Sequence, residues 1–378
     1  MTKKASTLLA LLATLALAIP ATAWANAETF SDGNDVAGPL DIRSVSMGHA
    51  GGRMTHTLRT FDGFSGRLLD GNSLVAFAFD TNDTASSIER LAVVFWANGS
   101  LRCVVINRRG NAVGRCAVSR PNRRAVKVKL SRRSLGRHDG YRWGALAIAR
   151  SHADIAPNHR LVLHDITAPT ITFPTPAIPT GMTYDVAFTV RDSGGAGLEQ
   201  WKLQRRTFGE TSWSTFASGD GEGSHAVSIT AAEGDDDQYR VVAVDRQENR
   251  RISRVATVSI PVDDANAAIT YLGPTWSHAT GVPGAFLTTL SSAADAEEGF
   301  TYGFSGSYVA LVGTGTCARG QVTIEDADGH QDIGFLDDPC NDRPRQILYR
   351  KSLSPGTYTV TVGWDGGSTL SFDGIIVR

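Results

Sequence analysis

The stretch Tyr239-Arg-Val-Val-Ala-Val-Asp245 decides the fold class of this chain. Successive side chains of a strand point to opposite faces, so Tyr239, Val241 and Ala243 share one face and predict a β-strand. Short alternating or apolar runs bounded by Gly, Asp, Asn or Pro recur along the chain, and no stretch after Ala27 keeps a 3.6-residue apolar period. The sequence therefore predicts an all-β protein.

Thirteen runs of this kind, the stretch above included, are the clearest strand candidates. They cover residues 74–79, 90–96, 102–107, 125–130, 141–148, 184–191, 200–206, 226–230, 238–244, 308–312, 322–325, 357–364 and 374–377. Proline and threonine gather between two groups of these strands, in Ile166-Thr-Ala-Pro169 and again at Pro261-Val-Asp-Asp264. We expect three consecutive antiparallel β-sandwich domains, over residues 28–165, 167–262 and 263–378.

The first 27 residues have the pattern of a signal peptide. Lys3 and Lys4 precede a run of small and apolar residues from Leu8 to Ile19, and Ala25-Asn-Ala27 is an A-x-A cleavage signal. The apolar run is too short and too Ala-rich for a transmembrane helix, and no later segment reaches the roughly 20 apolar residues that a span needs. The pattern predicts a signal peptide over residues 1–27 and a secreted, monomeric protein without a membrane span.

The four cysteines form two local pairs, Cys103 with Cys116 and Cys317 with Cys340. An exported chain meets an oxidising environment, where such pairs persist as disulfides. The loops that they would close span about 14 and 24 residues, and each closure is worth roughly 3 kcal/mol in the chain-entropy model. A zinc site is the alternative, but no C-x2-C spacing occurs and the pairs lie in different predicted domains.

The middle segment resembles a fibronectin type III or related bacterial immunoglobulin-like module. The residues that carry the resemblance are Tyr184-Asp-Val-Ala-Phe-Thr-Val-Arg-Asp192, Trp201-Lys-Leu-Gln-Arg-Arg206 and Tyr239-to-Asp245 with Asn249 after it. Tyr239 stands near the strand start, as a tyrosine-corner residue does. The resemblance implies a spacer or a protein-binding unit, and therefore architecture rather than chemistry.

The last segment resembles the galactose-binding-like jelly rolls, of the carbohydrate-binding-module type, that are appended to bacterial glycoside hydrolases and cell-surface proteins. The matching residues are Tyr271-Leu-Gly-Pro-Thr-Trp276, Gly303-to-Gly313, Val322-to-Gly329, Leu353-to-Val362 and Phe372-Asp-Gly-Ile-Ile-Val377. The first segment resembles a secreted bacterial β-sandwich that is similar to DOMON and carbohydrate-binding folds, through residues 34–45, 56–62, 77–81 and 141–143. That resemblance brings no assigned activity with it.

Sugar recognition needs aromatic faces that stack on pyranose rings and a few planar hydrogen-bonding groups. Trp276, Tyr349 and Trp364 supply the first and Arg319 the second, which predicts a carbohydrate site in the last domain. A single aromatic residue is more often part of a core than of a ligand site, above all Trp364 at the end of an apolar strand.

Acidic residues gather near strand ends of the first domain. Asp35, Asp41, Asp80 and Asp83 offer the oxygen ligands that calcium prefers, and the alternative is that they cap turns. Asp326-Ala-Asp-Gly-His-Gln-Asp332 departs from an EF-hand loop, and its Asp328-Gly329 indicates a hairpin turn. His152, His159 and His164 lack the spacing of a zinc site and are interpreted as part of a polar linker.

The charge of the chain is −1 overall but is unevenly distributed. Between Leu101 and Arg150 there are 14 Lys or Arg residues against one acid, Asp139. Alternation in Val126-Lys-Val-Lys-Leu130 directs the lysines to one face, which is either a solvated surface or a contact for acidic cell-wall polymers. Nucleic acid is not expected as a partner, because no aromatic residues interleave the basic ones in an exported protein.

The sequence thus predicts a secreted, non-enzymatic binding protein that recognises a polysaccharide or cell-envelope glycan, with calcium as the one cofactor considered. No G-x-S-x-G motif occurs and nothing nominates a pair of catalytic carboxylates. Two alternatives stay open. One is a secreted hydrolase with its site in the first domain, and the other is a structural or interaction protein without a small ligand.

Overall fold

The computed structural model describes residues 25–50, 52–70, 73–82, 88–150, 152–158, 160–174, 178–295 and 297–378. The predicted signal peptide lies outside these residues up to position 24, and the predicted cleavage after Ala27 falls within strand β1 (Ala25–Ser31). The described chain is nearly all β, with strands that pair antiparallel, so the predicted fold class is confirmed. Among the described residues no helix is long and apolar enough to cross a membrane.

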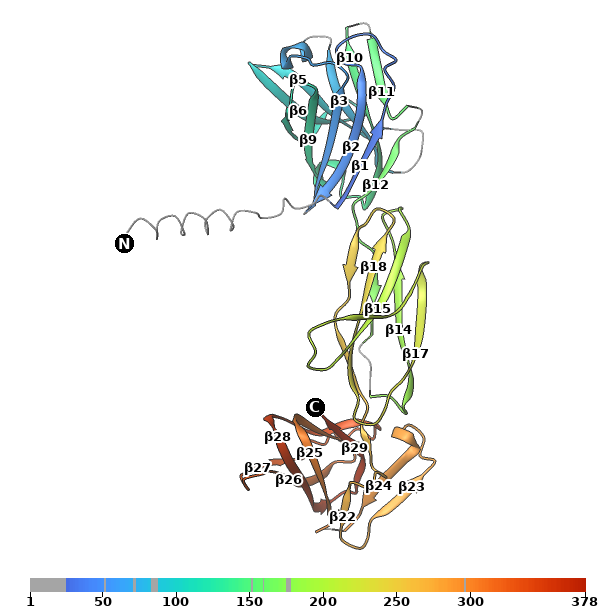
Figure 1. Ribbon diagram of the computed structural model, residues 1–378, viewed down its shortest axis with the longest axis vertical. Helices are drawn as coiled ribbons and strands as arrows, with labels where there is room; N and C mark the ends of the chain where they lie inside the picture. The colour runs from blue at the N-terminus through green and yellow to red at the C-terminus, as the bar shows by residue number, and fades with distance from the viewer. Residues whose placement is uncertain are drawn as a thin grey trace, which may run out of the picture.

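Three β-rich bodies follow one another along the long axis of the molecule (Figure 1). The first is a sandwich of two sheets and two 3-10 helices, η1 (Gly66–Leu69) and η2 (Arg132–Leu135). One sheet has the order β1, β2 (Ile42–Ala50), β3 (Arg53–Thr60), β9 (Ala125–Ser131), β8 (Ala117–Ser119). The other has the order β11 (His152–Ala156), β10 (Gly140–Ala149), β4 (Leu74–Asp80), β5 (Arg90–Ala97), β6 (Ser100–Asn107), β7 (Ala112–Arg115), with β12 (Val162–Asp165) beside β10.

The core between these two sheets follows from alternation. Val126, Val128 and Leu130 of β9 are buried, while Lys127 and Lys129 point the other way, as the sequence predicts. Trp143 and Phe77 are fully buried between the sheets. Each such large apolar side chain stabilises the fold by about 1.5–3 kcal/mol relative to an exposed position.

The second body pairs a three-stranded sheet with a five-stranded one. The first sheet has the order β13 (Thr170–Thr172), β14 (Thr183–Arg191), β17 (Gly223–Thr230), and the second β16 (Ser214–Gly219), β15 (Leu198–Thr207), β18 (Asp236–Asp245), β19 (Arg250–Ile252), with β20 (Ala256–Ser259) beside β18. Tyr239, Val241 and Ala243 are buried as predicted. The Tyr239 hydroxyl bonds with the hydroxyl of Tyr184 at 2.9 Å and with Asp237, so these side chains take the place of the backbone partner of a tyrosine corner.

The third body is built from one sheet of nine strands, seven in a continuous order and two beside it, β21 (Val262–Asp263) paired with β29 (Leu370–Val377) and β22 (Thr270–Leu272) paired with β25 (Gly299–Gly313). Its order is β23 (Ser277–Thr280), β24 (Thr289–Ala293), β29, β25, β28 (Gln346–Gly367), β26 (Ala318–Asp326), β27 (Gln331–Phe335), with the 3-10 helix η3 (Phe286–Thr288) before β24. The turn at Asp328-Gly329 joins β26 to β27, which confirms the predicted hairpin.

Both predicted disulfides are present, Cys103–Cys116 and Cys317–Cys340. Every predicted strand lies within an observed one. The observed strands are longer, above all β25 and β28, whose 15 and 22 residues contain the predicted 308–312 and 357–364. Long strands exceed the local pattern because hydrogen bonds to neighbouring strands continue the ladder through residues whose own alternation is weak.

Side chains from one body enter the next at both junctions. Between the first and second bodies, His49 bonds with Asn249 at 2.7 Å, and the Gln247 side chain donates to the carbonyl of Leu163 at 2.9 Å. Between the second and third, Phe286 is fully buried in the hydrophobic core of the second body. Arg378, at the chain end seen beside this junction in Figure 1, pairs with Asp236 at 2.7 Å.

Candidate functional site

Four arginines line a groove of about 680 Å³ on the first body. Arg43 comes from β2, Arg59 from β3, and Arg123 and Arg124 from the segment before β9, and all four are exposed. The groove is completed by hydroxyl and amide side chains, those of Thr29, Ser31, Ser44, Thr60 and Asn122.

The strand register explains why these residues meet. Ser31 of β1 pairs with Ser44 of β2, and Ser44 pairs with Arg59 of β3, so the three side chains lie side by side on one face of the sheet. Their neighbours Val45 and Leu58 are buried, which directs this row away from the core. The pairing of β2 with β3 slips between Ile42 and Ser44, so Arg43 is an extra residue, and such irregularities commonly re-aim a side chain.

Arg120 and Asn122 hold the segment that carries Arg123 and Arg124. The Arg120 guanidinium lies 4.2 Å from the centre of the Phe64 ring and donates to the carbonyls of Phe64 and Arg123, at 2.6 and 2.5 Å. The side-chain oxygen of Asn122 accepts from the Arg124 backbone N–H at 2.8 Å. The backbone that carries the two groove arginines is therefore held in place before any ligand arrives, which reduces the ordering cost of binding.

The groove is electropositive because its nine lining residues include no Asp or Glu. Within the part of the chain that the structure describes, no ion pair or hydrogen bond occupies the guanidinium groups of its four arginines. A planar guanidinium binds carboxylate, phosphate or sulfate through two parallel hydrogen bonds. The arrangement is suited to a ligand that carries several anionic groups and hydroxyls.

A second basic surface lies on the outer face of the middle body. The Trp213 ring lies 4.6 Å from the Arg206 guanidinium carbon and 4.3 Å from that of Arg240. The Nε of each arginine donates to a glutamine on the neighbouring strand, Gln238 or Gln204, at 2.7 Å. Burial, together with the positive charges of Arg250 and Arg206, lowers the pKa of Arg240. Like charges are thus gathered here around an aromatic ring.

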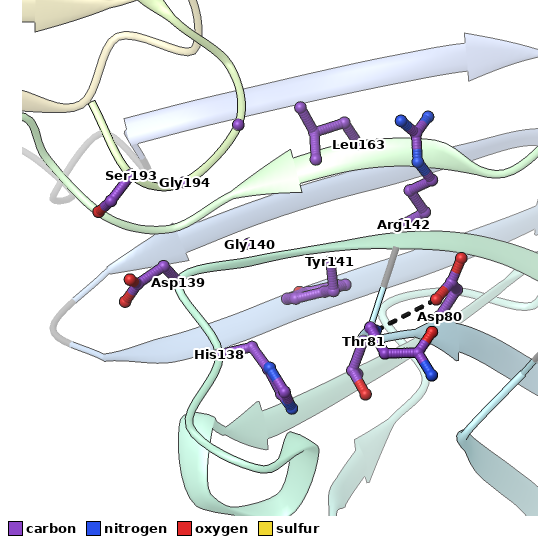
Figure 2. A pocket seen from close by; sticks show the side chains of 12 residues that line it. Asp80, Thr81, His138, Asp139, Gly140, Tyr141, Arg142, Leu163, Ser193 and Gly194 are labelled. Carbon is purple, nitrogen blue, oxygen red and sulfur yellow. Dashed lines mark hydrogen bonds between the residues drawn. The ribbon is translucent and has the colours of Figure 1, made fainter. Parts of the chain in front are cut away.

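A pocket of about 440 Å³ lies where the first and second bodies meet, with walls from β4, β10, β12 and the Ser193-to-Gly195 loop (Figure 2). Its polar groups are largely engaged within the protein. Asp139 pairs with Arg132 at 2.5 Å, and one oxygen of Asp80 accepts from the Asn82 N–H at 3.2 Å. The pocket is a crevice of the junction with few groups left to select a ligand.

A chain of buried hydrogen bonds runs from this junction into the first core. It links Asn249, His49, His164, Tyr141 and His56 in that order, with steps of 2.7, 3.0, 2.8 and 2.8 Å. Burial lowers the pKa of all three histidines, and that of His56 falls to about 3. The interpretation of His164 as a linker residue is wrong, because it is fully buried in β12. His159 lies outside the described residues.

The structure divides the predicted calcium ligands. Asp35 and Asp41 lie together, and Asp154 of β11 joins them, with one ligand oxygen of each within 4.8 Å of the others. Asp80 is at the other end of the sheet, and Asp83 lies outside the described residues. Asp154 pairs with Ala147 of β10, and Ala147 pairs on its other side with Val75 of β4. Val75 lies five residues before Asp80 along β4, a distance of about 16 Å at about 3.3 Å per residue. The four-residue set was therefore wrong in placing Asp80 with Asp35 and Asp41.

Two of the predicted sugar-binding residues belong to the core of the third body. Trp364 is 2% exposed and Tyr349 is 8% exposed, so neither ring offers a face to a ligand. They are buried because they lie on the core-facing side of β28 with Val360 and Val362, while Arg350, Thr359 and Asp365 of the same strand are exposed. Arg319 is exposed, and Trp276 is half-buried. The prediction that Trp364 and Tyr349 stack on a sugar ring is therefore wrong.

Trp276→Ala should lower the free energy of unfolding by about 1–3 kcal/mol, because this ring packs 4.7 Å from Tyr271 and 6.3 Å from Phe300 between ring centres. Urea denaturation of the full chain measures the loss. Phe335→Ala is the matched control, since Phe335 is 68% exposed and its loss should change stability by no more than about 0.5 kcal/mol. Unchanged stability with lost glycan retention would instead favour Trp276 as a stacking residue.

The groove could be foreseen only in part. The basic stretch around Arg123 and Arg124 is visible in the sequence, whereas Arg43 and Arg59 stand more than 60 positions before it. Alternation in residues 56–62 indicates that Arg59 faces away from His56 and Leu58. No signal in the sequence connects this face with the later arginines.

No protein-family model and no curated protein matches this chain. Similar solved structures include the carbohydrate-binding module CsCBM6-3 from Clostridium stercorarium in complex with cellobiose, at 13% identity, 30% coverage of this chain, 89% of that chain and a TM-score of 0.23. An exo-beta-1,3-galactanase from Phanerochaete chrysosporium with galactose has 11% identity, coverages of 93% and 95%, and a TM-score of 0.25. The FN1-FN3 domains of chicken CNTN1 have 12% identity, coverages of 90% and 100%, and a TM-score of 0.23. These similarities assign neither a family nor a ligand.

Proposed function

We propose that this chain is a secreted binding protein whose arginine groove, formed by Arg43, Arg59, Arg123 and Arg124, recognises an anionic polysaccharide or cell-envelope polymer. The observation that carries the proposal is a groove of about 680 Å³ with four exposed arginines and no acidic residue among its lining. Carboxylate, sulfate or phosphate groups supply the negative charge that these guanidinium groups bind.

The shape and composition of the groove favour a polymer over a small anion. It extends from β1 over β2 and β3 to the segment before β9, so its arginines are spread over two strands and a loop. The hydroxyls of Thr29, Ser31 and Ser44 line the same groove and match the hydroxyls of a sugar chain. Lys127 and Lys129 continue the basic character of the same sheet face.

Export and modular organisation complete the proposal. Two disulfides are typical of proteins that fold outside the reducing cytosol, and the pattern of residues 1–27 is that of a signal peptide. We assign the groove to the module of residues 28–165, followed by modules of residues 167–262 and 263–378. The second and third modules would then act as spacers that keep the groove away from any partner bound at the C-terminal end of the chain.

The test is binding of the full chain to heparin, polygalacturonate and uncharged dextran, each immobilised, at about 0.15 M salt. We expect retention on the two anionic polymers and none on dextran. The double variant Arg59→Ala/Arg124→Ala should bind roughly 10- to 100-fold more weakly, since each charge-assisted hydrogen bond contributes about 1–1.5 kcal/mol. Raising the salt concentration should weaken wild-type binding, because salt screens exposed charges.

Arg108→Ala/Arg109→Ala is the matched control, because it removes the same charge from an exposed turn outside the groove. It should leave retention close to wild type. Equal losses in both double variants would show that net charge alone drives binding and would defeat the groove assignment. Retained binding in the groove variant, lost on Trp213→Ala, would move the site to the middle body.

A further inference from the structure

Four carboxylates converge at the end of the first body that lies away from the second. Asp32 and Asp35 lie in the loop after β1, Asp41 directly precedes β2, and Asp154 lies in β11. Ligand oxygens of Asp35, Asp41 and Asp154 are within 4.8 Å of one another. The Asn158 side chain bonds to both Asp32 and Asp35, which places Asp32 beside this group.

Two of the four carboxylates are buried, Asp32 is half-buried and Asp35 is exposed, and no cation among the described residues pairs with them. Asp41 and Asp154 are each 4% exposed. Oδ1 of Asp41 and Oδ2 of Asp32 are buried and have no hydrogen-bond partner. The ion pairs within the described residues include none of the four. Burial and the neighbouring carboxylates raise the pKa of Asp32 to about 6.

The remaining contacts hold the carboxylates facing one another. The Asn158 side chain donates to Asp32 at 2.7 Å and to Asp35 at 3.4 Å, and the Ile42 backbone N–H donates to Asp154 at 2.5 Å. The Gly33 N–H also donates to Asp32 at 3.1 Å. These N–H groups are far too few for eight carboxylate oxygens. Burying an unpaired carboxylate costs several kcal/mol. A cation bound between these carboxylates would remove that cost.

Two other acidic groups of the chain accept more hydrogen bonds from the protein. Asp165, Asp192 and Asp245 also lie within 4.8 Å of one another, but their oxygens accept from backbone N–H groups, among them those of Ala196 and Gly197. The Asp326, Asp328 and His330 group lies in the exposed β26–β27 turn, where Asp326 accepts from backbone N–H groups of that turn. In the first of these groups Oδ1 of Asp192 is buried without a partner, whereas the group around Asp41 contains two such oxygens, on Asp41 and Asp32.

From these contacts we propose a calcium site formed by Asp35, Asp41 and Asp154, with Asp32 held beside it by Asn158. Calcium takes six to eight oxygen ligands at about 2.3–2.6 Å in a flexible geometry, and two oxygens that bind one such ion are at most about 5 Å apart. The donor set consists of oxygen alone, which suits a hard cation and disfavours zinc. The site ties the loop between β1 and β2 to β11, and it does not depend on the function of the arginine groove.

The experiment is thermal unfolding of the full chain with 5 mM EDTA, with calcium chloride and with magnesium chloride, in the absence of any polymer. Calcium at a hundred times its dissociation constant should raise the Tm of the first body by about 5–10 °C. Magnesium at the same concentration should have a smaller effect, because it demands a stricter octahedral geometry. Isothermal titration should show a calcium-binding event that is absent in Asp41→Asn.

Asp41→Asn separates a metal site from a structural contact. It should abolish the calcium shift and yet be at least as stable as wild type in EDTA, because it removes a buried, unpaired charge. Asp80→Asn is the matched control, a buried acid of the same body about 16 Å away, and it should keep the full calcium shift. A wild-type Tm that does not respond to calcium, or an unchanged response in Asp41→Asn, would overturn the proposal.

Discussion

Replacing Phe286 by alanine should cost about 3–5 kcal/mol of stability, the largest loss expected from a single side chain at either junction. Phe286 belongs to η3 of the third body but is fully buried in the hydrophobic core of the second. The variant would leave a cavity among side chains that come from another part of the chain. Urea denaturation should show the second body unfolding at lower denaturant.

The backbone around Phe286 supports this expectation. Leu287 and Thr288 have φ angles of 47° and 62°, which are unfavourable for residues with side chains. Such strain costs about 1–3 kcal/mol per residue and persists only where surrounding contacts impose it. The contacts are the Phe286 N–H donating to Asp373 at 2.8 Å and the Leu287 N–H donating to the Thr180 carbonyl at 2.9 Å. These two hydrogen bonds and the burial of the Phe286 ring together hold the strained segment in place.

Phe335→Ala serves as the control for this variant too, because Phe335 lies in the same body and is 68% exposed. Its effect should stay within about 0.5 kcal/mol. A loss below about 1 kcal/mol in Phe286→Ala would mean that the ring does not fill the core of the second body. Small-angle scattering should in addition show a wider range of orientations between the second and third bodies in this variant.

The second large effect concerns pH. The pKa of His56 is lowered by burial to about 3, from about 6.5 in the unfolded chain. Between these values the unfolded state binds the proton and the folded state does not, so this contribution to stability is complete above pH 6.5 and decreases as the pH falls. The slope is about 1.4 kcal/mol per pH unit, and the loss for His56 alone at pH 5 is about 2 kcal/mol.

His56→Gln isolates this contribution, because glutamine keeps a hydrogen-bonding group near the Tyr141 hydroxyl but does not titrate. The difference in unfolding free energy between the two proteins should move by about 2 kcal/mol in favour of the variant from pH 7.5 to pH 5. Buried carboxyls act in the opposite direction in both proteins, since the pKa of Asp165 is raised by burial to about 7. The comparison is therefore made between variants and not from wild type alone.

His330→Gln is the control, because the His330 side chain is 80% exposed in the β26–β27 turn. Its stability should follow the wild-type pH curve. Parallel curves for wild type and His56→Gln would show that His56 takes up its proton in the folded state and would contradict its burial among Trp143, Phe77 and Phe79.

The spacing of neighbouring residues in the sequence was enough to predict several features of this chain. The two-residue alternation in Tyr239-to-Asp245 and in Val126-to-Leu130 predicted strands and their buried faces, because the side-chain period of a strand depends on the backbone alone. The separations of 13 and 23 residues within the cysteine pairs predicted both disulfides, because a short connection keeps the two cysteines of a pair close together. These features need no knowledge of how the sheets are arranged.

The candidate sites depended on sheet order and register, which are set by contacts between distant residues. Arg43 and Arg59 meet Arg123 and Arg124 because β3 lies between β2 and β9. Asp41 meets Asp154, 113 positions later, because β11 supplies the carboxylate that binds the Ile42 N–H. Trp364 is an aromatic residue at a strand end in the sequence, and its place in the middle of a nine-stranded sheet decides that it is core.

The amino-acid sequence by itself determined that the chain forms antiparallel strands and two disulfides. The period of the apolar residues and the spacing of the cysteines are local properties of the sequence. The tertiary structure alone decided which strands are neighbours, and thereby which charges share a surface. A one-residue slip between two strands would turn Arg59 into the core and Leu58 outward, so the groove exists only in the observed register. That register is fixed by the burial of the whole apolar face, to which residues far apart in the sequence contribute together.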